Sequence, residues 1–371
     1  MEHSFTAKIK EILQQHFGKN ADEIFKASEL LTYINNKTAS AGKGSKSRSS
    51  FANLYAIYVL VEDYLKQGYD GKGGYSDEYG GAIFIDLFNR QRKLPFGGSL
   101  QNHALNNRMN GEFEKFFPNS EYIPILRNQE TNKYWINENL LKIRLNNKTY
   151  NIGKPIIAII DQYIQTKQDS FQRFIKQCEE LQQMEEKDSQ TVKDFIISLL
   201  APNVDARLFE IVSYGILKYY YQDKVIIWGY SMEELREDNL ILYKTGRTNA
   251  NDGGIDFVMK PLGTFFQVTE TTDFKKYFLD IDKVQKYPIT FVIKSTETEE
   301  DLYAKIKGNA KKVYAIEQIV DKYMNCIEEV INIDKLKGYF IDAVEAKHLK
   351  KILAEIILQS KVEFNIDDEE E

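Results

Sequence analysis

The sequence predicts a mixed α/β (α+β) protein in which helices flank short strands, preceded by a largely helical N-terminal region. Residues 201–295 alternate between stretches with apolar residues at helical spacing and short strand-like runs. Near the N-terminus, the apolar residues recur mainly at helical spacing. At 371 residues, the chain is long enough for one large or two ordinary domains with a buried core.

Composition and charge exclude several classes of protein. The chain is 43% hydrophobic and 28% charged, which is typical of a soluble globular protein. It has no run of about 18 apolar residues, which a membrane span requires, and its N-terminus predicts an amphipathic helix instead of a signal peptide. We therefore expect a cytoplasmic protein. The net charge of −6 argues against a nucleic-acid coat protein. Cys178 and Cys326 are isolated, which argues against structural zinc and a disulfide framework.

A basic segment near the N-terminus is the first candidate for DNA contact. Residues 1–36 predict two short helices, and residues 50–68 predict a strong third helix with Ser49 or Ser50 as its cap. The segment between them, residues 37–50, contains Lys37, Lys43, Lys46 and Arg48, no acid and mostly small residues. It is either a solvated linker or a loop that orders on a phosphate backbone.

A second candidate for DNA contact follows a glycine-rich turn. Residues 82–117 run from a strand-like stretch through a loop to a helix. They collect basic and amide side chains, namely Arg90, Arg92, Lys93, Gln101, Asn102, His103, Asn106, Asn107 and Arg108. Arginine and the amides make paired hydrogen bonds to guanine and adenine edges in the major groove. The alternative is an ordinary polar helix face.

The chain divides into four parts by composition and pattern. We expect an N-terminal DNA-recognition region over residues 1–166, which ends with short strands and an apolar run, and a charged helical connector over 167–200. The catalytic core then covers 201–298. Three or four helices and the acidic tail IDDEEE complete the chain over 299–371.

The part from residue 201 onward carries the clearest local signals. DARLFEIVSYGILKYYYQ predicts a helix capped by Asp205, and KVIIWGYS predicts a short buried strand. GIDFVMK and TFFQVTE predict two strands joined by a turn at residues 261–263. A helix over TTDFKKYFLDIDKVQKY and a strand over PITFVIKS follow.

The two strands joined at residues 261–263 bring oxygen ligands together. Side chains alternate along a strand, so Gln267 shares a face with Thr269, and Glu270 points to the opposite face. Asp256, the Gln267 amide oxygen and the main-chain carbonyl of Val268 could converge on one Mg²⁺ ion, which prefers hard oxygen ligands. Such an ion would polarise a phosphodiester for hydrolysis.

Each of these residues also has a purely structural interpretation. Asp256 could cap a turn after Gly253-Gly254, and Gln267 could be a satisfied amide in the core. Thr269 is a common strand residue, and Glu210 could be a surface charge of its helix.

The order of these elements resembles the core of the PD-(D/E)xK nuclease superfamily, in the branch whose second motif begins with glutamine. TGRTNANDGGIDFVM is similar to that branch's glycine-rich approach to its aspartate, FFQVT to its Q-x-K strand, and FEIVSYGILK to its glutamate-bearing first helix. The resemblance covers residues 201–295, and with the accessory N-terminal half it indicates a type II restriction endonuclease, in the ApaLI-like group.

The resemblance implies a mixed central sheet flanked by helices, with a catalytic or metal-binding role for Asp256, Gln267, Val268, Thr269 and Glu210. Arg247 and Asn251 would hold phosphate or shape the loop before Asp256. It also implies Mg²⁺ as cofactor and double-stranded DNA as substrate. A short palindromic site is most simply read by a homodimer. A cognate DNA methyltransferase is expected to be encoded nearby.

One position departs from the family pattern, because Thr269 stands where a lysine is usual. The lysine's role could have moved to Lys260, Lys218, Lys275 or Lys276. It could also be taken by a second metal or a solvent network, or the enzyme could be weak or dead. A DNA-binding protein that lost its activity therefore stays open as a second function. A third, separate alternative is a glycosidase that uses Asp256 and a distant carboxylate.

Overall fold

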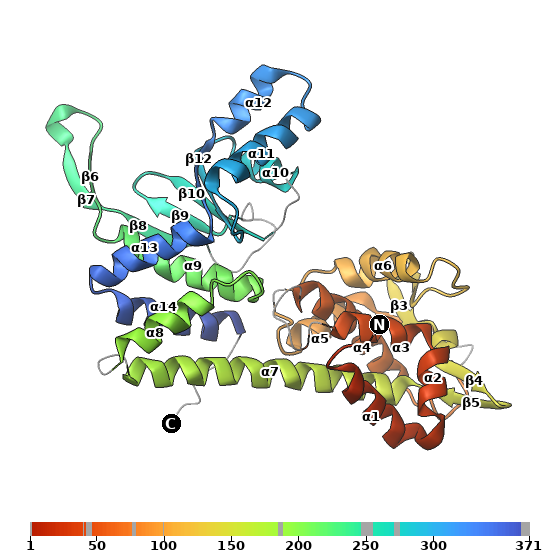
Figure 1. The fold of residues 1–371 in the computed structure, drawn as a ribbon. Helices are drawn as coiled ribbons and strands as arrows, with labels where there is room; N and C mark the ends of the chain where they lie inside the picture. Colours follow the sequence, from red (N-terminus) through yellow and green to blue (C-terminus); the bar gives the residue numbers. More distant parts are fainter. Residues whose placement is uncertain are drawn as a thin grey trace. The chain divides into compact units, whose positions relative to one another are not determined.

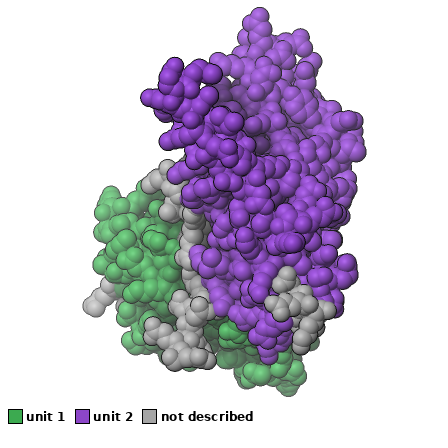
Figure 2. Space-filling view, turned by 90° about the vertical axis from the view of Figure 1, so that its left-hand side faces the viewer, with its two compact units in different colours: residues 1–172 green, residues 173–371 purple. Residues whose placement is uncertain are grey.

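The computed structural model describes residues 2–39, 41, 47–75, 79–98, 100–184, 188–245, 255–270 and 275–364. The chain forms two compact units, residues 1–172 (unit 1) and 173–371 (unit 2), which Figure 2 shows in separate colours. The fold is of the mixed α/β class, as predicted. No helix in the described ranges is long and apolar enough to cross a membrane.

Unit 1 is built around one long buried helix. Residues 50–61 of α4 (Ser47–Lys66) are all buried, so this helix is surrounded by other elements on every side. The N-terminal part has three helices where two were predicted. The other helical elements of unit 1 are α1 (Thr6–Phe17), η1 (Gly18–Asn20), α2 (Ala21–Ala27), α3 (Glu29–Thr38), α5 (Phe84–Lys93), the π-helical turn η2 (Ala104–Arg108), α6 (Met109–Phe116) and η3 (Glu138–Leu140).

The strands of unit 1 form two small antiparallel sheets. β1 (Ala82–Ile83), β3 (Lys133–Ile136) and β2 (Ile125–Asn128) pair in the order β1-β3-β2, and β4 (Lys142–Leu145) pairs with β5 (Lys148–Asn151). The strand-like stretch predicted from residue 82 was wrong beyond its first two residues. It continues as α5, since Phe84, Leu87, Phe88 and Gln91 recur at helical spacing and the last two turns bury Leu87 and Gln91.

A 32-residue helix, α7 (Gly153–Met184), begins in unit 1 and ends in unit 2. It is followed by α8 (Ser189–Ser198), whose N-cap Asp188 accepts a hydrogen bond from the Thr191 N–H. Both helices fall largely within the segment predicted as a helical connector.

Unit 2 contains a five-stranded mixed sheet in the order β12-β11-β10-β9-β8 (Figure 1). β8 (Ile241–Lys244), β9 (Phe257–Lys260) and β10 (Thr264–Thr269) form an antiparallel meander. β11 (Ile289–Ile293) and β12 (Ile327–Ile331) then add in parallel, because α10 (Lys275–Lys283) and two later helices provide the crossovers. The predicted helix, hairpin, helix and strand are confirmed in this order.

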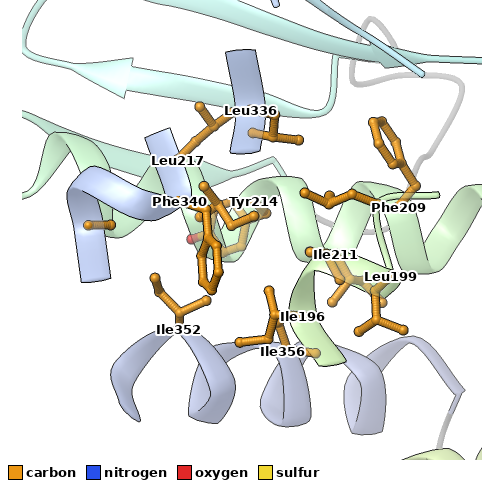
Figure 3. Packing of buried hydrophobic residues seen from close by; sticks show 14 of the residues in the cluster. Ile196, Leu199, Phe209, Ile211, Tyr214, Leu217, Leu336, Phe340, Ile352 and Ile356 are labelled. Atoms are coloured by element: carbon orange, nitrogen blue, oxygen red, sulfur yellow. The ribbon is translucent and has the colours of Figure 1, made fainter. Parts of the chain in front are cut away.

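The two faces of this sheet pack against different helices. Alternate residues of β10 and β11 face opposite sides, so Phe266 and Val292 join one hydrophobic cluster, and Phe291 and Ile293 join another. The first cluster includes residues of α9 (Ala206–Tyr221), and Figure 3 shows Tyr214 and Leu217 in the same cluster as Leu336, Phe340, Ile352 and Ile356 of the C-terminal helices. We refer to these sides as the α9 face and the α10 face.

The end of the chain contains a strand that the pattern did not predict. Helices α11 (Glu299–Val313) and α12 (Glu317–Met324) belong to the cluster on the α10 face, and helices α13 (Ile333–Glu345) and α14 (Leu349–Phe364) to the cluster on the α9 face. Between these pairs, β12 forms an edge of the sheet. The all-helical prediction for residues 299–364 was therefore wrong at this point.

The strand predicted as buried, KVIIWGYS, is exposed. β6 (Val225–Trp228) pairs only with β7 (Arg236–Asn239), and η4 (Met232–Glu234) lies in their connection. Every residue from 225 to 239 is exposed or half-buried. We call residues 224–239 the ribbon. Figure 1 shows it extending away from the sheet of unit 2.

Candidate functional site

The carboxyl ends of three strands meet at one edge of the main sheet. β8 and β10 both run antiparallel to β9, and β11 runs parallel to β10. The ends of β8, β10 and β11 therefore lie beside the start of β9, where Asp256 stands. Ligand sites of open α/β sheets occur at such edges.

Asp256 holds the two strands together at this edge. Its main-chain N–H donates to the Phe266 carbonyl at 3.1 Å, and its Oδ2 accepts hydrogen bonds from the Val268 N–H at 2.7 Å and from Gln267 Nε2 at 2.8 Å. A side-chain oxygen of Asp256 thus continues the hydrogen bonding between β9 and β10 beyond the first residue of β9. Asp256, Gln267 and Val268, three of the predicted ligands, lie within hydrogen-bond distance of one another.

Gln267 is nearly fully buried and has one atom without a partner. Its amide nitrogen faces Asp256 and, at 3.4 Å, the Val268 carbonyl. Its Oε1 is shielded from solvent and accepts no hydrogen bond from the described residues. A buried amide oxygen without a donor is costly, so this atom is the strongest sign of a missing ligand at the edge.

Thr269 has a structural contact in place of a free hydroxyl. It shares a side-chain hydrogen bond with Tyr277 of α10, and both residues are buried. Burial raises the pKa of the Tyr277 phenol, so the phenol stays neutral. The family's lysine position is thus occupied by a group that ties β10 to α10.

Glu210 lies on the other face of the sheet from Gln267 and Thr269. Its Oε1 is 3.3 Å from the Nζ of Lys244, a β8 residue that pairs with Phe257. Phe257 belongs to the cluster on the α9 face, whereas Gln267 pairs with Phe291 of the α10 face. The structure therefore gives Glu210 a lysine partner and does not bring it beside Gln267.

A buried cation that the sequence analysis missed ends β11. The Lys294 main-chain N–H donates to the Thr269 carbonyl at 2.9 Å, and its side chain is 2% exposed. Its ammonium donates to the Val204 carbonyl and lies 3.3 Å from Glu270 Oε2, on the α9 face. The signal was present in PITFVIKS, because a strand parallel to β10 must end at the same edge.

The lysines proposed as substitutes for the missing motif lysine lie elsewhere. Lys260 pairs with Ile241 at the far end of β9, roughly 13 Å from Asp256 along the strand, and its ammonium lies over the Tyr243 ring. Lys218 is 2.7 Å from Glu355 of α14. The side chains of Lys275 and Lys276 lie outside the described part of the chain.

The predicted DNA-contact residues in unit 1 divide into engaged and exposed groups. Arg90 donates two hydrogen bonds to Glu62, each 2.8 Å long, and Asn106 accepts one from the Tyr134 hydroxyl. Both therefore have structural roles. Arg92 donates to the Gly98 carbonyl from an exposed position. The remaining residues are exposed: Lys93, Gln101, Asn102, His103, Asn107 and Arg108.

Several predicted contacts lie outside the described residues. These are Lys43, Lys46, Arg247 and Asn251, together with the side chain of Arg48, whose main chain lies in the first turn of α4. Lys37, in the same basic segment, is buried and pairs with Glu112 at 2.5 Å.

The described residues contain no group of three or more histidine, cysteine or acidic side chains that could hold a metal ion. Any ion at Asp256 would therefore depend on amide and carbonyl oxygens as well as on this carboxylate. In comparisons with known proteins, no family model, no curated protein and no solved structure matches this chain.

Proposed function

We propose that this chain is a type II restriction endonuclease that hydrolyses double-stranded DNA at a short, palindromic site with Mg²⁺. The observation that carries the proposal is the pairing of Asp256 with Gln267 and Val268 at the carboxyl edge of a mixed sheet. The order of helix, three-stranded meander, helix and parallel strand supports assignment of this sheet to the PD-(D/E)xK superfamily.

The donor set at this edge suits magnesium. Asp256 offers a carboxylate, Val268 a carbonyl and Gln267 a buried amide oxygen that has no donor within the described structure. Rotation of the Gln267 amide would direct its oxygen toward Asp256, an arrangement that is repulsive unless a cation is present. Bound by these three groups, Mg²⁺ would polarise the scissile phosphate and lower the pKa of a water molecule.

Lys294 places a positive charge at the same edge of the sheet, on the α9 face and therefore opposite the face that carries Thr269. It ends the strand next to β10 and is held in place by Glu270 and the Val204 carbonyl. A fixed ammonium in a poorly hydrated place interacts strongly with developing negative charge. In this proposal, Lys294 is a positioning residue that holds the Glu270 carboxylate at the edge, and Lys244 holds Glu210 in the same way.

Unit 1 would contact the DNA through its exposed basic and amide residues. The last turn of α5 carries Arg92 and Lys93, and Gln101, Asn102 and Arg108 follow at exposed positions. These types of side chain bind phosphates and the edges of purines. A twofold protein would read a palindrome, and a cognate methyltransferase would protect host DNA at the same sequence.

A catalytically impaired DNA-binding protein on the same fold is the second candidate. Thr269 is hydrogen-bonded to Tyr277, and Asp256 Oδ2 already accepts two hydrogen bonds. Both residues could therefore be purely structural.

Digestion of plasmid and phage DNA of known sequence tests the proposal. In Mg²⁺, we expect discrete fragments whose sequenced ends share one short motif. Replacing a direct ligand should cost more than the 10–100-fold that is typical of residues behind a ligand, so Asp256→Asn should lower cleavage by at least about a hundredfold. Asp321→Asn, which changes an exposed acid of α12, should cleave like the wild type.

The alternatives have distinct outcomes in the same assay. Specific DNA binding in Ca²⁺ without cleavage in Mg²⁺ or Mn²⁺ would select the impaired protein. Absence of both specific binding and cleavage would reject the nuclease and DNA-binding functions together. Equal activity of wild type and Asp256→Asn would place the active site elsewhere.

A further inference from the structure

Among the described residues of unit 2, the ribbon carries the three most exposed large apolar side chains, namely Tyr230 at 92%, Met232 at 79% and Ile227 at 70%. Val225 and Leu235 of the ribbon are also exposed, at 47% and 46%. An isolated two-stranded ribbon is only marginally stable in water. An apolar surface of this kind on a ribbon outside the main sheet indicates that another molecule covers it.

The two faces of the ribbon differ. On one face, Trp228 donates to Asp238 at 2.7 Å, and the Arg236 guanidinium lies 3.8 Å from the Trp228 ring centre. This face therefore satisfies its own polar groups. The other face presents Val225 and Ile227, which pair across the ribbon with Asn239 and Glu237.

The apolar face continues onto the edge of the main sheet. β8 follows β7 after one residue. Since alternate residues of an extended chain face the same side, the exposed Ile241 and Tyr243 face the same side as Glu237 and Asn239. The intervening Leu240 and Leu242 are buried in the cluster on the α9 face. β8 is also the last strand in the sheet order, with β9 as its partner. Within the described residues this short edge carries exposed apolar side chains and has no second strand, so it can continue the apolar face of the ribbon.

The charge pattern of the ribbon selects the occupant. The connection and β7 carry Glu233, Glu234, Glu237 and Asp238 against Arg236, so the tip would repel a phosphate backbone. The end of the ribbon nearest the main sheet carries positive charge, because Lys224 precedes β6 and Lys260 pairs with Ile241 of β8. Two ribbons in antiparallel contact would place the acidic tip of one against the basic base of the other.

We propose that the ribbon is a dimerisation arm, and that its occupant is a second copy of this chain. The contact is isologous: Val225, Ile227 and the tip residues of one protomer cover the same residues of the other around a twofold axis. Glu233 and Glu234 face Lys224 of the partner. This inference does not depend on the proposed nuclease activity.

Sedimentation velocity of the full-length protein over a range of concentrations tests the arm. We expect a dimer, and for Ile227→Glu a dimer dissociation constant raised by roughly tenfold or more, as for a central interface residue. Ile341→Glu, a change at an exposed apolar position of α13, is the matched control and should leave the constant unchanged. Circular dichroism melting should be the same for both variants at a concentration low enough to keep both monomeric, since neither residue lies in a core.

A charge exchange tests the orientation of the two ribbons. Glu233→Lys with Glu234→Lys should weaken the dimer, and adding Lys224→Glu should restore part of the loss. The proposal would be overturned if the wild type stayed monomeric at tens of micromolar. A dimer dissociation constant above about 10⁻⁵ M corresponds to a weak association. A dimer that is insensitive to both Ile227→Glu and the charge changes would also overturn it. A failure here would leave the cleavage assay unaffected, because that assay tests a different part of unit 2.

Discussion

Lys294 is the residue whose role the structure changed most. It combines near-complete burial with an ion pair to Glu270 and a main-chain bond to the strand that carries Gln267 and Thr269. A buried ammonium with a defined partner is far more effective electrostatically than an exposed lysine. Its ammonium lies at the carboxyl edge on the α9 face, where it fixes Glu270 behind the strand that carries Gln267 and Thr269.

Lys294→Met should reduce cleavage without reducing DNA affinity. Loss of a residue that acts through another group typically costs about 10–100-fold, so we expect a fall of that size in the cleavage rate with an unchanged dissociation constant for DNA in Ca²⁺. Lys294→Arg should recover part of the rate, and its pH–rate profile should match the wild type.

The matched control for this variant is Lys218→Met, which removes a lysine paired with Glu355. If Lys294→Met and Lys218→Met lower the melting temperature and the rate in proportion, Lys294 has a purely structural role. Full activity of Lys294→Met would exclude a role of this lysine in the reaction.

At the scale of single elements, the N-terminus of α9 is stabilised by a capping hydrogen bond to Asp205. Asp205 precedes the helix and accepts a hydrogen bond from the Arg207 N–H at 2.7 Å, as its place before an apolar stripe predicts. Asp205→Ala should lower the free energy of unfolding by roughly 1 kcal/mol, whereas Asp205→Asn should retain most of it. Urea denaturation measures both, and equal losses for the two variants would show that the cap contributes little.

The ion pair between Glu62 of α4 and Arg90 of α5 makes a contribution to stability that depends on pH. The hydrogen bonds from Arg90 hold the pKa of Glu62 below its usual value of 4.5. A carboxylate with a lowered pKa contributes stability above its unfolded-state pKa and loses it as the pH falls through the folded-state pKa. The pair is partly solvent-screened, so Arg90→Met should destabilise by about 0.5–1 kcal/mol at pH 7.

This difference should begin to decrease as the pH falls below about 4.5, where Glu62 becomes protonated in the unfolded chain, and should vanish below the lowered pKa of Glu62 in the folded protein. Denaturant melts of wild type and Arg90→Met at pH 7, 5 and 3 measure it. Lys66→Met removes the more exposed partner of Glu62 and should have a smaller effect. A pH-independent loss would point to packing of the Arg90 stem.

Elements with strong local signals were predicted correctly, and elements set by long-range pairing were not. The α9 stripe, the turn at 261–263 and the apolar strand at 289–293 are properties of neighbouring residues. The burial of β6 is not, because VIIW has the composition of a core strand and only its pairing with β7 leaves it exposed. The pairing of β12 with β11 is similarly non-local.

The candidate site was predictable to the same extent. The step from Asp256 to Gln267 follows from a tight hairpin, so their contact could be expected. The partners of Glu210, Arg90 and Lys294 could not, since they come from other strands and helices. Lys294 required knowledge that β11 runs parallel to β10.

At the scale of the whole molecule, the chain would bind DNA despite its net charge of −6. Phosphate contacts release counterions, and each contributes about 0.9 to the slope of log affinity against log salt. Changing Arg92, Lys93 and Arg108 together to Ala should therefore reduce this slope by up to about 3. Filter binding or fluorescence anisotropy measures this slope when the salt concentration is varied from about 50 to about 200 mM.

The control for this prediction changes Lys307, Lys311 and Lys312 of α11 to Ala, which removes the same number of positive charges from another helix. This variant should keep the wild-type slope. Equal slopes for all three proteins would remove α5 and the segment after it from the DNA interface.

The packing on α9 also has a consequence for how the protein is made. The cluster around Phe209 and Phe257 draws members from Cys178 to Ile357, including Leu336, Phe340 and Ile352 of the last two helices (Figure 3). A chain still on the ribosome therefore exposes the α9 stripe and one side of the sheet until the residues up to Ile357 have emerged. Nascent chains that stop before this point lack the helices that cover the α9 face. If the protein cuts DNA, its activity would appear only after these helices have been made, which limits damage from shorter products.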